Sequence, residues 1–383
     1  MILYVRTQGS RIIKEGQHLL VKKELDTYHT LFVHKLRQLL LFGNVALTPA
    51  ARRILLRQGV DTVFLTVDGR YLDRFEQAEA KNIFLRKRQF ERINDADFGL
   101  RFSRQVVAGK LANAMTMLMR ISRTKTSKEP GERAKEIRNL IDQVKTAATL
   151  DTLRGYEGRA AALYFGALRH GFTTDMGFRR RVRRPPTDPV NAVLSLLYTF
   201  LLNRVYAAVR IAYLDPYIGY LHSLDYGRHS LVMDLMEEFR VIVADTLTLA
   251  LFNLKVLGTD DFETAPSEEL PAAEEEGEAP DVLADFYSLS ESGDPAEVFD
   301  MPPQRMDEAV SRQEDGRGKA GLFLKSEPFR RVITNFERKL TTEFFYEPYN
   351  RKITYEEAII AQAGQYRRLI EGEIHEYQPL LLK

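Results

Sequence analysis

The chain has 383 residues, with 55 Lys and Arg against 53 Asp and Glu, and it contains no cysteine. This length predicts two or three domains with a core large enough to need no cross-links. The lack of cysteine excludes disulfides, thiolate metal sites and a cysteine nucleophile. Residues 1–16 have no apolar run after a basic start, and the apolar stretches 194–202 and 247–254 are shorter than the roughly 20 residues that span a bilayer. We expect a soluble cytoplasmic protein without membrane contact.

The charge is unevenly distributed along the chain. Residues 260–300 hold 15 acids and no Lys or Arg, which leaves 55 basic against 38 acidic residues, a net charge of +17, in the rest. Clustered Lys and Arg favour a polyanionic partner, because neutralised phosphates release their counterions. The charge therefore favours nucleic-acid binding over a basic surface without such a partner.

Residues 1–77 predict a small β-rich domain. Short apolar or alternating runs, separated by Gly, Asn and Asp, predict strands at Ile2–Val5, Leu19–Lys23, Leu31–Lys35, Leu39–Phe42 and Val63–Val67. Thr48 as N-cap and Pro49 at the first helical position predict one helix over residues 50–58. Asp68-Gly69 predicts a hairpin turn before a further strand.

Residues 78–383 predict a larger all-α domain, so the expected fold class is α+β. The apolar spacing becomes helical from about residue 80. It predicts helices over residues 97–122, 132–147, 156–169, 189–212, 229–257, 328–342 and 354–371. Residues 262–318 are rich in acid, Pro, Ser and Gly, which predicts a disordered or irregular insertion. That insertion is either inert or a segment that binds a partner or shields the basic surface.

The residues that could carry chemistry are acids and one histidine on helices. The chain has no phosphate-binding Walker loop, no GxSxG and no HExxH motif. In GRHSLVMDLMEEFR, Asp234 and Glu237 are three residues apart and share a helix face, while Glu238 lies slightly off that face. His222 lies in YIGYLHSLDY, and Glu157 opens the predicted helix in YEGRAAALYF.

Each of these residues also has a purely structural interpretation. A Glu near a helix start favours the helix dipole, and a lone His is commonly a hydrogen-bonded core residue. Two or three carboxylates with one imidazole nevertheless suit Mn²⁺ or Mg²⁺, which can activate a hydroxyl and stabilise charge at phosphorus. The spacing alone is compatible with both interpretations.

A second group of candidates is basic. Residues 179–184 read RRRVRR before a Pro-Pro pair. A loop with five arginines between helices is suited to grip phosphates, although it could also be a solvated basic loop. The candidate phosphate-binding residues there are Arg179, Arg180, Arg181, Arg183 and Arg184.

Several motifs, in order along the chain, resemble those of the CRISPR-associated adaptation integrases (Cas one), the large subunit of the complex that inserts new spacers. The matching stretches are LYVRTQGSRIIKEG, HKLRQLLLFGNVALTPAARRILLRQGVDTVFLTVDGRYL, VAGKLANAM, YEGRAAALYF, DPVNAVLSLLYTFL, LDPYIGYLH, GRHSLVMDLMEEFR and ITYEEAIIAQAGQYRRLIEGEIHEYQPLL. In VAGKLANAM the family's AGK-x-x-N segment is present, although Ala114 stands where a Gln is usual. Residues 262–318 lack a counterpart.

The resemblance implies a metal site formed by Glu157, His222 and Glu237, with Asp234 as an additional acid. It selects Glu237 over Glu238, which the spacing could not do. It also implies phosphoryl transfer, in which a prespacer 3′-hydroxyl attacks phosphodiesters at the ends of a repeat, with hydrolysis of DNA at the same site.

The resemblance further implies partners for the chain. The β-rich domain is expected to form a homodimer, and the chain is expected to assemble with the small subunit (Cas two), double-stranded prespacer DNA and CRISPR repeat DNA. Lys110 and Arg228 join the arginines of 179–184 as candidates for binding DNA phosphates. Two alternatives remain open: a transposon-encoded integrase relative, and a DNA-binding scaffold without catalysis.

Overall fold

The computed structural model describes residues 2–23, 26–67, 69, 71–75, 82–182, 186–264 and 321–382. The chain forms two compact units, the first ending at Ala80 and the second beginning at Lys81. The sequence predicted a boundary after residue 77.

The first unit is built from two four-stranded sheets and one helix. One sheet has the order β1-β5-β7-β8 and the other β4-β3-β2-β6. The strands are β1 (Ile2–Val5), β2 (Ser10–Glu15), β3 (His18–Lys23), β4 (Asp26–Phe32), β5 (Gln38–Phe42), β6 (Val45–Leu47), β7 (Asp61–Leu65) and β8 (Tyr71–Arg74). β1, β5 and β7 are parallel, whereas β2, β3 and β4 form an antiparallel meander.

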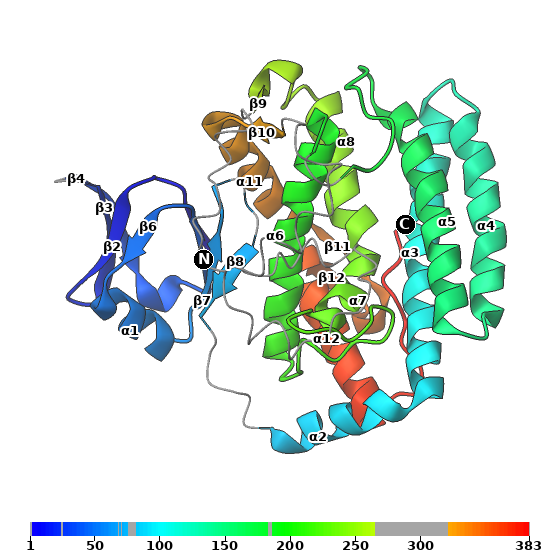
Figure 1. Ribbon diagram of the computed structural model, residues 1–383, viewed down its shortest axis with the longest axis horizontal. Coiled ribbons are helices and arrows are strands. Elements are labelled where there is room, and N and C mark those ends of the chain that lie inside the picture. Colours follow the sequence, from blue (N-terminus) through cyan, green and yellow to red (C-terminus); the bar gives the residue numbers. More distant parts are fainter. Residues whose placement is uncertain are drawn as a thin grey trace, which may run out of the picture. The chain divides into compact units, whose positions relative to one another are not determined.

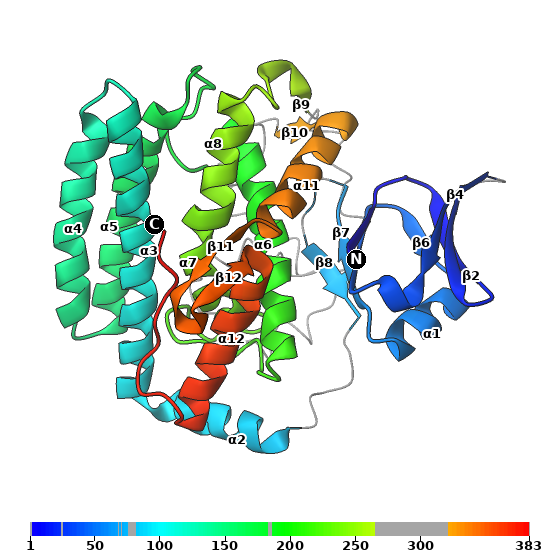
Figure 2. The same ribbon diagram turned by 180° about the vertical axis from the view of Figure 1, so that it is seen from behind.

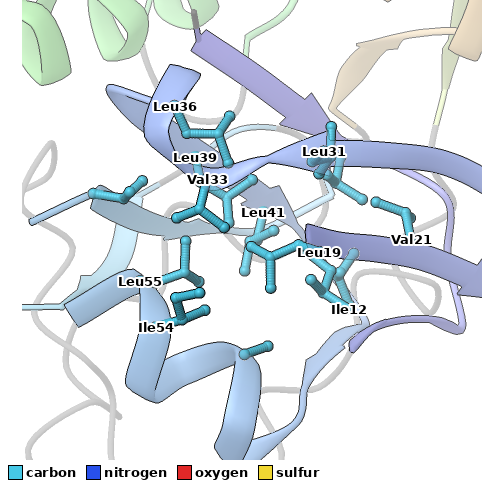
Figure 3. Close-up of a cluster of buried hydrophobic side chains, with 14 residues drawn as sticks. Ile12, Leu19, Val21, Leu31, Val33, Leu36, Leu39, Leu41, Ile54 and Leu55 are labelled. Carbon is cyan, nitrogen blue, oxygen red and sulfur yellow. The ribbon is translucent and has the colours of Figure 1, made fainter. Parts of the chain in front are cut away.

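The core of this unit is apolar and shared by both sheets and by helix α1 (Pro49–Arg57) (Figure 3). Ile12 and Leu19 come from one sheet, Leu39 from the other, and Leu55 from α1, and all four are fully buried. The alternation of apolar and polar residues along β2 and the helical spacing in α1 turn these side chains to the same interior.

Most of the predicted elements of this unit are confirmed. Thr48 caps α1 by accepting a hydrogen bond from Ala51 N at 3.3 Å, and β7 and β8 form the expected antiparallel hairpin, although Asp68 itself lies outside the described residues. The predicted strand Leu31–Lys35 is wrong in its second half. The strand ends at Phe32, and Val33–Lys35 form a 3₁₀ turn closed by the bond from Leu36 N to Val33 O at 2.9 Å.

The second unit is mostly helical (Figures 1 and 2). Helices α3, α4 and α5 lie side by side in both views, and α6 packs against α7 and α12. The helices are α2 (Ile83–Glu91), α3 (Ala96–Thr124), α4 (Glu129–Thr146), α5 (Leu150–Leu168), α6 (Pro189–Ile211), α7 (Ser230–Phe239), α8 (Thr246–Asn253), α11 (Ser326–Leu340) and α12 (Tyr355–Glu371).

Helix α6 is the central apolar helix of the second unit. Asp188 caps it by accepting a hydrogen bond from Asn191 N at 2.9 Å, with Pro189 at its first position. By length and composition alone it could cross a membrane, contrary to the expectation from the sequence. However, 89% of its apolar window is buried inside the structure. The rest of the unit therefore covers most of its apolar surface, as it does for a core helix.

Three predicted helices differ most from the observed ones. α4 begins at Glu129, because Pro130 lies in its first turn, where a missing N–H is harmless. α5 begins six residues early, at Leu150, where Thr149 accepts a hydrogen bond from Thr152 N at 3.1 Å. The predicted helix 229–257 is α7 and α8 joined by a π-helical segment, Arg240–Asp245.

The second unit is not entirely α-helical. β9 (Phe262–Thr264) pairs with β10 (Leu322–Leu324), and β11 (Glu343–Tyr346) pairs with β12 (Arg351–Thr354), both antiparallel. The first pair corrects the predicted start of the insertion, because the first three of its residues, Phe262–Thr264, form strand β9. The rest of the insertion, residues 265–318, lies outside the described residues.

The C-terminal segment after α12 runs along α3 (Figures 1 and 2). The Tyr377 ring lies edge-on to Phe102 of α3, with 5.2 Å between the ring centroids. A Cβ on Gly109 of α3 would meet Pro379 Cβ at 2.4 Å, so only glycine admits the segment this close. The chain end is therefore part of the packing around α3.

Candidate active site

The candidate site is centred on α7, whose residues are all buried. Glu237 and Asp234 lie on one face of this helix, as their spacing predicts. Asp234 is fully buried and Glu237 is 2% exposed. Carboxylates removed from water to this degree need charged or hydrogen-bonding partners, and those partners define the site.

Asp234 holds the loop that carries His222. Its Oδ2 accepts hydrogen bonds from Tyr220 N at 2.7 Å and Leu221 N at 3.1 Å, and its Oδ1 accepts one from His222 N at 3.0 Å. The same Oδ1 lies 2.7 Å from His222 Nδ1. Because a carboxylate only accepts, Nδ1 carries the hydrogen in this bond. Asp234 thus positions the imidazole and directs its Nε2, which lies 3.8 Å from Glu237 Oε1, towards Glu237.

Glu157 approaches from another helix. It lies in the middle of α5, not at a helix start as the sequence suggested, so the helix-dipole interpretation does not apply. Its side chain is 26% exposed and pairs with the Lys110 ammonium of α3. The second partner of Lys110 Nζ is Glu237 Oε2, at 2.6 Å. Lys110 therefore joins Glu157 and Glu237, which are 80 residues apart in the sequence.

The donor set suits a divalent metal. Glu157 and Glu237 offer carboxylate oxygens and His222 offers an imidazole nitrogen, the mixture expected for Mn²⁺ or Mg²⁺. The ammonium between the two carboxylates shows that this gap accepts a cation. In the described part of the chain, no three His, Asp or Glu side chains are gathered closely enough to hold an ion as they stand. At this site the Lys110 ammonium lies between the carboxylates of Glu157 and Glu237.

Arg240, which follows α7, is a further cation beside the site. Its Nη2 lies 3.2 Å from Glu237 Oε1. Burial alone would raise the pKa of Glu237, but the charges of Arg240 and Lys110 outweigh burial and lower that pKa below its ordinary value. Glu237 is therefore a carboxylate that keeps its negative charge in a buried position.

Arg240 also leads away from the site into a second buried cluster. Its guanidinium lies over the Tyr198 ring, 5.0 Å from the centroid, and the Arg181 guanidinium lies over the same ring at 5.4 Å. The Tyr198 hydroxyl donates to Asp245 Oδ1 at 2.7 Å. Burial raises the pKa of Asp245 to about 6. The π-helical segment carries both Arg240 and Asp245, and such segments are frequent at functional sites.

Glu238 faces away from the candidate site. Its carboxylate accepts hydrogen bonds from the Tyr377 hydroxyl at 2.5 Å, from Gln362 Nε2 at 2.8 Å and from Leu380 N. Burial raises the pKa of Glu238 to about 7, against the lowering effect of these donors. The two neighbouring acids therefore differ in role: Glu237 lies with His222, and Glu238 holds the C-terminal segment.

Asn113 holds the same segment from α3. Its Nδ2 donates to Glu238 O and to Leu380 O, both at 2.9 Å, and its Oδ1 accepts from Leu382 N at 2.7 Å. In the AGK-x-x-N segment, Gly109 and Asn113 share one face and bind the chain end, and Lys110 points to the candidate site. Sequence reasoning missed this role of Asn113, although its four-residue spacing from Gly109 was a signal.

The candidate DNA-binding arginines have different surroundings. Arg179 and Arg180 are exposed, and Arg179 pairs with Asp175 at 2.7 Å. Arg181 is bound within the fold, donating to Asn191 Oδ1 at 2.8 Å, which suits packing better than a phosphate grip. Arg183 and Arg184 lie outside the described residues.

Arg228 is held in the loop that carries His222. It is 8% exposed, donates to Ser223 Oγ at 2.8 Å and lies 3.0 Å from Asp225. These contacts indicate a structural role for Arg228 in shaping the loop.

The chain belongs to the family described as CRISPR associated protein Cas1, whose model matches residues 3–275. It is 35% identical over 266 residues to a CRISPR-associated endonuclease Cas1 of Thermus thermophilus, covering 68% of this chain and 77% of that protein. A second such endonuclease, from Chlorobaculum tepidum, is 34% identical over 268 residues, covering 68% of this chain and 78% of that protein.

Solved structures share the fold at lower identity. A CAS1 protein from Thermotoga maritima has a TM-score of 0.73 at 19% identity, with each chain covered fully. A casposase bound to its integration product has a TM-score of 0.74 at 17% identity, over 98% of this chain and 92% of that one. A Cas6-RT-Cas1–Cas2 complex has a TM-score of 0.76 at 21% identity, and this chain spans 36% of the matched chain. The expected fold, a strand-rich N-terminal part and a mostly helical C-terminal part, is confirmed.

Proposed function

We propose that this chain is a metal-dependent DNA integrase of CRISPR adaptation, with DNA hydrolysis as a second reaction of the same site. The observation that carries the proposal is the convergence of Glu157, His222 and Glu237 in a Cas1 family member. These residues come from α5, from a loop and from α7, so only the folded chain assembles them.

Glu157, His222 and Glu237 would hold Mn²⁺ or Mg²⁺. The bound ion would supply positive charge to a phosphodiester oxygen and lower the pKa of an attacking hydroxyl or water. Asp234 fixes the imidazole through Nδ1 and leaves Nε2 as the ligand atom, as second-shell carboxylates do for metal-binding histidines. Arg240 keeps Glu237 ionised.

The reaction proposed is a transesterification. The 3′-oxygen of a prespacer strand forms a bond to phosphorus in the repeat DNA, and the bond from that phosphorus to the 3′-oxygen of the neighbouring nucleotide breaks. The proton of the attacking hydroxyl is balanced by the one that the leaving oxygen takes up. One phosphodiester replaces another, so the reaction needs no energy from a nucleoside triphosphate. Water in place of the prespacer hydroxyl gives the endonuclease reaction.

Charge and relatives support DNA as the substrate. Outside residues 260–300 the chain has a net charge of +17, and the matched proteins of Thermus and Chlorobaculum are named endonucleases. We propose double-stranded prespacer DNA and CRISPR repeat DNA as substrates, with Arg179 and Arg180 as the exposed phosphate contacts among the described arginines.

Assembly follows the same reasoning. One structural neighbour is a complex named for Cas1 and Cas2, which supports a Cas2 partner for this chain. We further propose a homodimer formed through the first unit, and action in the cytoplasm, where the genome is.

Strand transfer by the purified full-length chain tests the proposal. A labelled prespacer duplex and a supercoiled plasmid bearing the repeat should give labelled plasmid with Mn²⁺ and none with EDTA. Glu157→Ala and His222→Ala should reduce the product at least 100-fold. Glu343→Ala, which removes an exposed acid of β11, should leave it unchanged. Equal product from all three variants would refute the site.

Two alternatives have distinct outcomes in this assay. A DNA-binding scaffold would retain the labelled duplex without joining it under any metal. A transposon-type integrase, which the casposase neighbour keeps open, would join terminal inverted repeats better than prespacers and would need no repeat in the target. The curated relatives at 34–35% identity favour the CRISPR reaction.

A further inference from the structure

Lys110 is the cation at the centre of the candidate site. Its side chain is 16% exposed, and its ammonium contacts Glu157 Oε1 and lies 2.6 Å from Glu237 Oε2. The Cα of Lys110 is held in place because Gly109 packs on Pro379 and Asn113 is hydrogen-bonded to the C-terminal segment. The flexible part of this contact is the four-carbon side chain of the lysine.

The two carboxylates need this charge. Glu237 is 2% exposed and Glu157 is within reach of the same nitrogen atom, so without a cation the pair would repel at short range. Arg240 contacts the other oxygen of Glu237, Oε1. Lys110 thus contacts both carboxylates through one nitrogen atom, and it balances the charge across the gap between them.

A divalent ion held by Glu157 and Glu237 would compete with Lys110. Both cations require oxygens of the same two side chains, and an ammonium beside a divalent ion is repelled more strongly the drier the site is. The side chain can leave because it is long, whereas the backbone of α3 cannot.

Resting on the proposed metal site, we propose that Lys110 is a resident counter-cation that the metal displaces. In the metal-free protein its ammonium holds Glu157 and Glu237 together. Metal binding releases the ammonium, which then neutralises a phosphate of the DNA at the same site. Lys110 therefore contributes to DNA binding only after metal has bound, and it weakens metal affinity in the absence of DNA.

Titration of Mn²⁺ without DNA tests the exchange. By calorimetry, Lys110→Met should bind Mn²⁺ at least 10-fold more tightly than the wild type. Lys339→Met removes a half-buried lysine of α11 that lies over the Tyr355 ring, and it should bind like the wild type. Equal or weaker Mn²⁺ binding by Lys110→Met would overturn the proposal. If Glu157→Ala binds Mn²⁺ as the wild type does, the metal site itself is refuted, which is a separate outcome.

A second measurement uses the wild-type protein and does not depend on the folding of a variant. Labelling with an amine-reactive reagent, quantified by mass spectrometry, should rise several-fold at Lys110 when Mg²⁺ is added. Lys339 serves as the internal control because its labelling should not respond to Mg²⁺. Unchanged labelling of Lys110 at saturating Mg²⁺ would overturn the exchange.

DNA affinity gives the complementary result. With Mn²⁺ present, Lys110→Met should lower the slope of log affinity against log salt by about one, the value for one lost phosphate contact. With EDTA the slope should equal that of the wild type. A slope lowered equally in both conditions would show that Lys110 binds DNA whether or not metal is bound, against the proposal.

Discussion

Replacing Asn113 should weaken the packing of the C-terminal segment against α3 and α7. Asn113 is fully buried, and its amide makes three hydrogen bonds: to Glu238 O, to Leu380 O and from Leu382 N. In Asn113→Ala, three backbone groups lose this partner: the buried carbonyl of Glu238 and the partly buried groups of Leu380 and Leu382. At about 1 kcal/mol for each bond, we expect the free energy of unfolding to fall by about 3 kcal/mol.

Urea denaturation followed by far-UV circular dichroism measures this loss, since most helices belong to the second unit. Asn113→Asp keeps the side-chain volume and the acceptor oxygen but replaces the donor nitrogen. If the lost hydrogen bonds cause the destabilisation, Asn113→Asp should be at least as unstable as Asn113→Ala. If a cavity causes it, Asn113→Asp should be as stable as the wild type. Asn335→Ala is the control, because the Asn335 amide donates within its own helix, to Arg331 O at 2.8 Å. A loss for Asn113→Ala no larger than that of Asn335→Ala would refute the reasoning.

Three further changes test neighbouring parts of the unit. Gly109→Ala should cost about 1–3 kcal/mol, because its Cβ would overlap Pro379 at 2.4 Å. Above about pH 7, where Glu238 is ionised in the folded state, Tyr377→Phe should cost about 1.5–3 kcal/mol in the same denaturation, because Glu238 loses the hydrogen bond from the Tyr377 hydroxyl. The Asp245 pKa of about 6 lies above its ordinary 3.8, so the folded state binds the extra proton. Stability relative to Asp245→Asn should therefore fall by about 3 kcal/mol as pH rises from about 4 to about 6.

Each of these changes has a control in the same unit. Gly155→Ala on α5 meets open space and should not destabilise. Tyr346→Phe removes a hydrogen bond to the neutral Gln362 amide, at 2.9 Å, and should cost less than Tyr377→Phe. Asp142→Asn removes an exposed acid of α4 and serves as the reference for Asp245→Asn. A control as severe as its partner, or a flat pH profile for Asp245→Asn, would contradict the corresponding prediction.

Local signals in the sequence predicted the elements well. Thr48 with Pro49 marks a helix start that the structure confirms, because a cap and a fixed proline φ act within one turn. Short apolar runs, which are also local signals, predicted the strands at Ile2–Val5 and Leu39–Phe42. Errors arose where residues close in the sequence do not determine the backbone conformation, as in the π-helical segment after α7.

The candidate site was predicted from motifs and not from spacing. Helical spacing placed Asp234 and Glu237 on one face, and family resemblance joined them to Glu157 and His222. The metal assignment remains a prediction. Spacing carried no information on Lys110, because its partners lie 47 and 127 residues further along the chain.

The sequence by itself determined most of the helices and strands, the basic charge of the chain outside its acidic segment, and the resemblance to the Cas1 family. Only the tertiary structure decided that Lys110 bridges Glu157 and Glu237, that Asp234 orients His222, and that Glu238 turns to the chain end. The reason is physical. Capping and periodicity act over three or four residues, whereas burial without water forces each polar group to find a partner anywhere in the fold.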